Sequence, residues 1–72
     1  MPNDVLTAAI ELLLAGEDLG RQGATRALGE IMAGRADEPQ TAAFLIALRA
    51  KGESAAELAG LAEAIRDRAV RV

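Results

Sequence analysis

The chain has 72 residues, of which 51% are hydrophobic and only Phe44 is aromatic, and its formal net charge is −3. It contains neither cysteine nor histidine, which excludes disulfides, thiolate chemistry, zinc sites and imidazole acid–base catalysis. The acidic balance argues against a nucleic-acid partner, and no apolar run reaches the ~18 residues of a membrane span. The opening residues MPNDVL do not resemble a signal peptide, so we expect a cytoplasmic protein without a membrane partner.

A first helix is predicted from about Asp4 to Ala15, with Asn3 or Asp4 as its N-cap and Gly16 just beyond its end. At about 100° per residue, its apolar side chains fill a continuous arc of roughly 240°. A helix on the surface of a monomer needs an apolar stripe of only about 100°. We therefore expect this helix to be contacted from two sides.

A second helix is predicted from about Arg21 to Ala33, and Gly34 ends it. Its start is weak because Gly20 occupies the cap position without a side-chain acceptor, and Gly23 costs about 1 kcal/mol relative to alanine. We expect this helix to fray first. One buried face follows the i, i+3, i+4, i+7, i+8 pattern and consists of Ala24, Ala27, Leu28, Ile31 and Met32.

A third helix is predicted between Asp37, a good N-cap, and Gly52. Pro39 suits its first turn, and Gln40 follows the cap by three residues, as in a capping box. From residue 42 to residue 48 every position is apolar, so apolar side chains surround the axis. This run predicts a helix that is covered on all sides and lies at the centre of the fold.

A fourth helix is predicted after Ser54, whose hydroxyl caps it while Glu57 reaches back in a capping box. Its charged residues 63 and 66–68 are expected to face water. Its buried face is predicted to be a narrow stripe of Leu58, Leu61, Ala62, Ile65 and Ala69.

Together these elements predict an all-α fold, a compact four-helix bundle of orthogonal or antiparallel helices with short loops, in one domain over residues 1–72. Four short helices cannot cover this much apolar surface, so we expect a second copy of the chain or a further domain to cover the rest. The residues predicted to form this interface are Val5, Ile10, Leu12, Leu14, Phe44 and Leu48.

No catalytic, cofactor-binding or metal-binding residue is predicted. The adjacent carboxylates Asp37 and Glu38 are explained by helix capping without a metal ion. Ser54 has no histidine partner, and Lys51 is interpreted as a charge at a helix C-terminus, not as a buried, activated amine. The arginines near the C-terminus are interrupted by Asp67 and have no aromatic neighbours, which favours a solvated helix face.

Three segments, LLLAGEDL, GEIMAGRADEPQTAAFLIALRAKGES and ELAGLAEAIRDRA, resemble in order the N-terminal helical domain of anthranilate phosphoribosyltransferases. Pyrimidine nucleoside phosphorylases share this domain, but the ending Leu-Arg-x-Lys-Gly-Glu favours the anthranilate branch. The chain departs from the family pattern at Gly20, Gly23 and Thr41.

The resemblance implies a role in a larger enzyme that transfers phosphoribose from phosphoribosyl pyrophosphate to anthranilate, a step of tryptophan biosynthesis. In that family a C-terminal α/β domain holds the Mg²⁺ and phosphoribosyl pyrophosphate sites, and the helical domain contributes to the homodimer and to one side of the active-site cleft. The chain alone is then expected to be inactive and to bind no cofactor. Two alternatives are a free-standing helical interaction module and the equivalent domain of a nucleoside phosphorylase.

Overall fold

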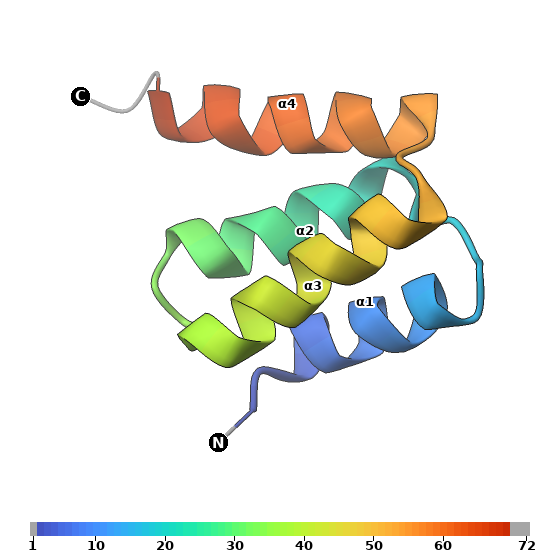
Figure 1. Cartoon of the computed structure of the whole chain (residues 1–72). Helices are drawn as coiled ribbons and strands as arrows, with labels where there is room; N and C mark the ends of the chain where they lie inside the picture. Colours follow the sequence, from blue (N-terminus) through green and yellow to red (C-terminus); the bar gives the residue numbers. More distant parts are fainter. Residues whose placement is uncertain (1, 70–72) are drawn as a thin grey trace.

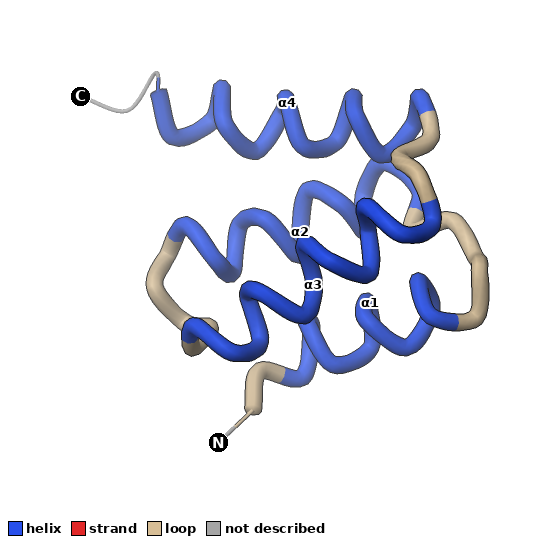
Figure 2. The backbone as a smooth tube through the Cα atoms, viewed as in Figure 1, coloured by secondary structure: helices blue, strands red, loops and turns tan. Residues whose placement is uncertain are grey.

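The computed structural model describes residues 2–69 as four α-helices joined by short loops, and no strand occurs among them (Figures 1 and 2). This confirms the all-α fold class and the short connections. The helices are α1 (Asp4–Leu14), α2 (Gly20–Met32), α3 (Glu38–Lys51) and α4 (Ala55–Ala69).

Side chains cap the helices largely where the sequence predicts. The Asn3 side chain accepts a hydrogen bond from the Leu6 N–H at the start of α1, and Asp37 accepts one from the Gln40 N–H at the start of α3. Gly52, at φ +91°, ends α3 in a backbone conformation that favours glycine. The second helix differs, because Gly20 is its first residue and no side chain at its N-cap position satisfies a backbone N–H.

The helices pack mainly as two pairs, α2 with α4 and α1 with α3, and a smaller contact between α1 and α2 joins the pairs. The main core cluster lies where the pairs meet. The prediction that the third helix is covered on all sides at the centre of the fold is therefore wrong: α3 packs chiefly on α1, and α2 connects the two pairs. The fully buried members of this cluster are Leu6, Ala27 and Phe44, surrounded by Ala9, Leu13, Ala47 and Leu48.

The apolar run of α3 is only partly buried. Phe44, Ala47 and Leu48 face the core, but Leu45 is 51% exposed and Ile46 is 69% exposed. The expectation that the whole run is surrounded is wrong, because one neighbouring helix can cover only about one face of α3. The composition of the run does not specify how many neighbours the helix has.

The face that α4 buries also differs from the predicted stripe. Leu58 and Ile65 are more than half exposed, whereas Gly60, Ala64 and the side chain of Glu57 are buried. The reason is the close approach of α4 to α2, since a Cβ atom added to Gly60 would overlap the carbonyl oxygen of Arg21. Small residues permit this approach and larger ones do not, so the leucine and isoleucine turn outward. The predicted contribution of the Ala69 side chain lies outside the described residues.

Candidate interaction surface

Large apolar side chains lie exposed on three of the four helices. The Cα atoms spread over 37 × 30 × 15 Å, so the domain is flat and its interior is thin. Contiguous exposed apolar patches are typical of sites that bind another protein segment. The exposed residues are Leu12 and Leu14 on α1, Leu45 and Ile46 on α3, and Leu58 and Ile65 on α4.

The interface residues predicted from the sequence fall into three groups. Leu12 and Leu14 are exposed, as an interface with another chain requires. Val5 and Ile10 are half-buried. Phe44 is fully buried and Leu48 is 5% exposed, so their assignment to an interface is wrong. Both side chains belong to the core cluster of this chain, in which α3 packs on α1. They are therefore not available to contact another chain.

A buried carboxylate joins three helices where their ends meet. Glu57 is fully buried and accepts hydrogen bonds from the backbone N–H of Leu19 at 2.7 Å and of Ser54 at 3.0 Å. Its third partner is the ammonium group of Lys51, at 2.8 Å. The Ser54 hydroxyl in turn accepts from the Glu57 N–H at 3.0 Å, which confirms the predicted capping box.

The Glu57 carboxylate therefore serves two helix N-termini, its own and that of α2. Burial alone would raise its pKa, but the hydrogen bonds from Leu19, Lys51 and Ser54 outweigh that effect and hold the pKa below its ordinary value. The side chain of Lys51 is 11% exposed and also donates to the carbonyl oxygen of Gly52 at 2.8 Å. The lysine does end α3, as predicted, and it is half-buried beside the fully buried Glu57.

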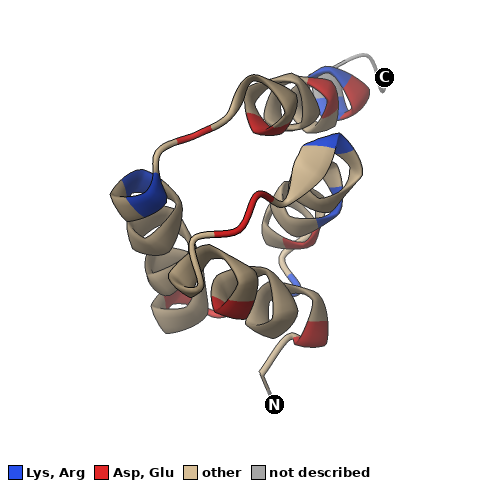
Figure 3. Cartoon of the chain, turned by 90° about the vertical axis from the view of Figure 1, so that its right-hand side faces the viewer, with Lys and Arg blue, Asp and Glu red and all other residues tan. Residues whose placement is uncertain are grey.

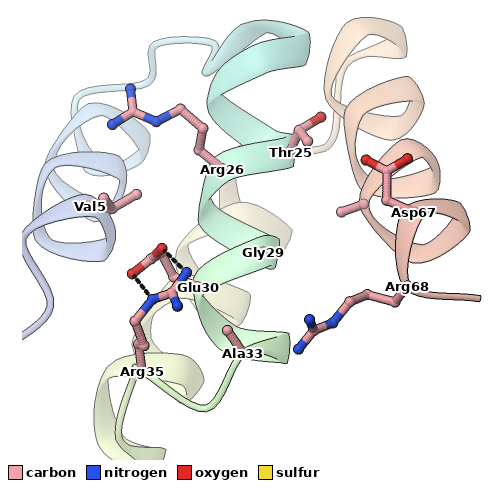
Figure 4. A pocket seen from close by; sticks show the side chains of 10 residues that line it. Val5, Thr25, Arg26, Gly29, Glu30, Ala33, Arg35, Asp67 and Arg68 are labelled. Atoms are coloured by element: carbon pink, nitrogen blue, oxygen red, sulfur yellow. Dashed lines mark hydrogen bonds and ion pairs between the residues drawn. The ribbon is translucent and has the colours of Figure 1, made fainter. Parts of the chain in front are cut away.

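A shallow groove of about 500 Å³ lies between α1, α2 and α4 and is lined mainly by polar and charged residues (Figure 4). Arg35 binds Glu30 through two hydrogen bonds, from Nε at 3.0 Å and from Nη2 at 2.8 Å. The Asn3 side chain donates to the same carboxylate at 2.8 Å. These contacts from Arg35 and Asn3 lower the pKa of Glu30 to about 2, and they fasten the start of α1 to the end of α2.

The Glu30 contacts predict a defined response to acid. Because the pKa of Glu30 is about 2 in the folded chain and near 4.5 when unperturbed, its stabilising contribution is complete above about pH 5 and fades towards pH 2. Glu30→Gln should lower the melting temperature at neutral pH, and its difference from the parent chain should shrink steadily on acidification. Thermal unfolding by circular dichroism from about pH 7 to about pH 2 measures this. Glu17→Gln, at an exposed loop position, is the control, and a gap between Glu30→Gln and the parent that stays constant with pH would contradict the assignment.

The described residues hold no arrangement that suggests chemistry. No group of three or more Asp, Glu, His or Cys side chains among residues 2–69 could hold a metal ion. Asp37 uses its carboxylate to cap α3, as predicted. Within the same range, every buried polar side-chain atom has a hydrogen-bond partner. None of the helices described has the length and apolarity needed to cross a bilayer.

Comparison with known proteins gives the chain a family. Residues 7–69 match the family described as glycosyl transferase family, helical bundle domain. The anthranilate phosphoribosyltransferase of Salinispora arenicola (strain CNS-205) is 53% identical over 60 residues, covering 83% of this chain and 17% of the relative. That of Brevibacillus brevis is 48% identical over 66 residues, covering 92% of this chain and 19% of the relative.

A third relative, the anthranilate phosphoribosyltransferase of Anaeromyxobacter dehalogenans (strain 2CP-C), is 52% identical over 64 residues, which is 89% of this chain and 19% of the relative. The chain thus spans less than a fifth of the length of these three relatives and corresponds to their N-terminal part. No solved structure matches the chain. The family match covers nearly all of the sequence, and the chain belongs to the glycosyl transferase family as its helical bundle domain.

Proposed function

We propose that this chain is the N-terminal helical domain of an anthranilate phosphoribosyltransferase-like enzyme of the cytoplasm. The observation that supports the proposal is a sequence identity of 48–53% to three proteins of that name. The matching region lies in the N-terminal part of each of these proteins. In this role the domain supplies contacts between two subunits and one wall of the active-site cleft. The whole enzyme transfers phosphoribose from phosphoribosyl pyrophosphate to anthranilate for tryptophan biosynthesis.

The described residues support a structural role in that reaction and not a chemical one. The chain has no histidine or cysteine, and its most buried carboxylate, Glu57, is fully engaged with Leu19, Lys51 and Ser54. Without these residue types the chain cannot form a Ser–His or Cys–His pair. We assign the sites for Mg²⁺ and phosphoribosyl pyrophosphate to the part of the enzyme that the relatives carry beyond this domain.

An assay of the 72-residue chain tests the absence of catalysis. Anthranilate fluorescence should remain constant after phosphoribosyl pyrophosphate and Mg²⁺ are added to the purified chain. A fluorescence decrease proportional to the concentration of the chain would refute the assignment of catalysis to another domain. The control is a full-length relative, such as the Salinispora arenicola protein, under the same conditions.

The exposed apolar side chains on α1, α3 and α4 also fit a second function, a free-standing module that binds other proteins. The coding sequence beyond Val72 separates the two. A reading frame that continues into a glycine-rich phosphate loop supports the transferase domain, whereas a stop codon supports the free-standing module. The same frame distinguishes the anthranilate branch from the nucleoside phosphorylase branch.

A further inference from the structure

A small apolar groove of about 140 Å³, here the α1–α2 groove, lies between α1 and the first half of α2. An apolar cavity of about 150 Å³ is large enough to bind benzene, so this groove has room for a body the size of one six-membered ring. The described residues that line it are glycine or apolar, with the exception of one arginine. They are Val5, Ala8, Ala9, Leu12, Leu19, Gly23 and Arg26.

Small residues leave the α1–α2 groove open. Ala8 and Ala9 on α1 and Gly23 on α2 have a single side-chain carbon atom or none, so they do not fill the space between the two helices. A Cβ atom added to Gly23 would lie 3.2 Å from the Cβ of Leu19, which also lines the groove. A larger residue at position 23 would therefore crowd Leu19 and reduce the space for a ligand.

Arg26 is the charged residue of the α1–α2 groove, and it has no ion pair with another residue of the described part of the chain. One turn further along α2, the Glu30 carboxylate already accepts two hydrogen bonds from Arg35 and one from Asn3. The Arg26 side chain is exposed and extends from α2 towards α1 (Figure 4). Its N–H groups are therefore free to bind an anion at the mouth of the groove.

The charges of the two helices indicate a single cation at this place. The helix α1 carries acidic residues but no lysine or arginine, so the positive charge at the groove comes from α2 (Figure 3). An apolar space with one cation at its edge suits a ligand that is apolar at one end and singly negative at the other. A carboxylate matches the arginine, because a guanidinium group and a carboxylate form parallel N–H···O hydrogen bonds in one plane.

We propose that the α1–α2 groove binds a small monocarboxylate whose apolar body is about the size of one six-membered ring. The ring lies between the two helices against Ala8, Ala9 and Gly23, and the carboxylate accepts hydrogen bonds from Arg26 at the mouth of the groove. The inference goes beyond the proposed function, because it depends only on residues of α1 and α2.

Benzoate is the probe, and its binding is measured by two-dimensional ¹H–¹⁵N NMR of the purified chain at constant ionic strength. Amide signals of α1 and of the first half of α2 should shift with saturation and give a Kd of about 1–5 mM. The affinity is low because Ala8 and Leu12 are exposed, so the groove covers only part of the ring. Benzamide has the ring without the charge and acetate the charge without the ring, and each should bind at least about tenfold more weakly.

Two variants test the two halves of the site. Arg26→Gln removes the cation and should weaken benzoate binding about tenfold. Arg66→Gln is its matched control and should stay within about twofold of the parent. Arg66 is also exposed and without an ion pair among the described residues, but it lies on α4 and does not line the groove. Ala8→Phe supplies a ring from the chain itself and should abolish binding while the far-UV circular dichroism spectrum stays unchanged, because Ala8 is exposed.

Shifts that grow linearly with benzoate up to about 50 mM, without saturation, would overturn the proposal. So would benzamide or acetate binding as tightly as benzoate, or Arg26→Gln and Arg66→Gln weakening the binding equally. None of these outcomes bears on the proposed function, which the reading frame beyond Val72 tests independently.

Discussion

Replacing Glu57 with alanine is expected to lower the free energy of unfolding by about 3–5 kcal/mol. The substitution leaves the half-buried ammonium of Lys51 with only the more distant carboxylate of Asp18, at 3.9 Å. It also leaves the N–H groups of Leu19 and Ser54 without acceptors. A domain of this size has a total stability of only about 4–11 kcal/mol, so the variant should melt at least ~15 °C below the parent.

Urea denaturation followed by circular dichroism measures the Glu57 effect, because it gives the free energy of unfolding directly. Glu53→Ala is the control, since Glu53 lies exposed in the loop just before α4 and should change stability by less than about 0.5 kcal/mol. Equal losses in the two variants would mean that the contacts of the buried carboxylate contribute nothing beyond those of a surface charge.

Replacing Gly60 with alanine is expected to destabilise the fold by at least about 1–3 kcal/mol, although alanine is the better helix former. The added Cβ atom would overlap the Arg21 carbonyl oxygen and lie 3.0 Å from the Cβ of Ala24, so α4 would have to move away from α2. That movement would also lengthen the hydrogen bond of 2.9 Å from the Thr25 hydroxyl to the Gly60 carbonyl oxygen.

The same substitution at Gly29 should have the opposite sign. A Cβ atom at Gly29, on α2, meets nothing within 4 Å, so Gly29→Ala should gain up to about 1 kcal/mol from helix propensity. Thermal and urea unfolding of the two variants give a direct comparison. Stabilisation by both substitutions would show that α2 and α4 do not pack as closely as described.

The sequence predicts the helices and their ends well, because the signals for these features are local. Asn3 and Asp37 cap the helices that follow them, and Ser54 forms the expected capping box with Glu57. Gly52 ends α3 with a positive φ. Each of these features depends on residues within one turn of each other, so spacing alone specifies them.

The sequence predicts less well which helix faces become buried, because this depends on contacts between distant segments. The apolar stripe of α4 predicts burial of Leu58 and Ile65, yet Gly60 brings a different face of α4 against α2. The apolar run of α3 likewise does not reveal that α1 is its main neighbour and that Leu45 and Ile46 stay exposed. The sequence signal that could have indicated the close approach of α4 to α2 is the glycine at position 60, inside the predicted fourth helix.

The candidate interaction surface was predicted in part. The surplus of apolar side chains is evident from composition, and the exposure of Leu12 and Leu14 agrees with it. The second role of Glu57, as acceptor for the start of α2, could not be predicted because residues 19 and 57 come together only in the folded chain. The second helix has no side-chain cap from its N-cap residue, Leu19. The carboxylates of Asp18 and of Glu57 from the fourth helix accept hydrogen bonds from the N–H groups of Gly20 and Leu19 instead.

The most direct test of the proposed function is a chimeric enzyme that carries this domain. Residues 7–69 would replace the matching N-terminal segment of the Salinispora arenicola anthranilate phosphoribosyltransferase, and the measurement is the initial rate of anthranilate consumption, followed by fluorescence. The account predicts that the chimera turns over within about tenfold of its parent, a difference of about 1.4 kcal/mol in the barrier, while the enzyme without the segment is inactive. A chimera that folds and remains soluble but consumes no anthranilate would contradict the claim that this chain is a working helical domain of that enzyme.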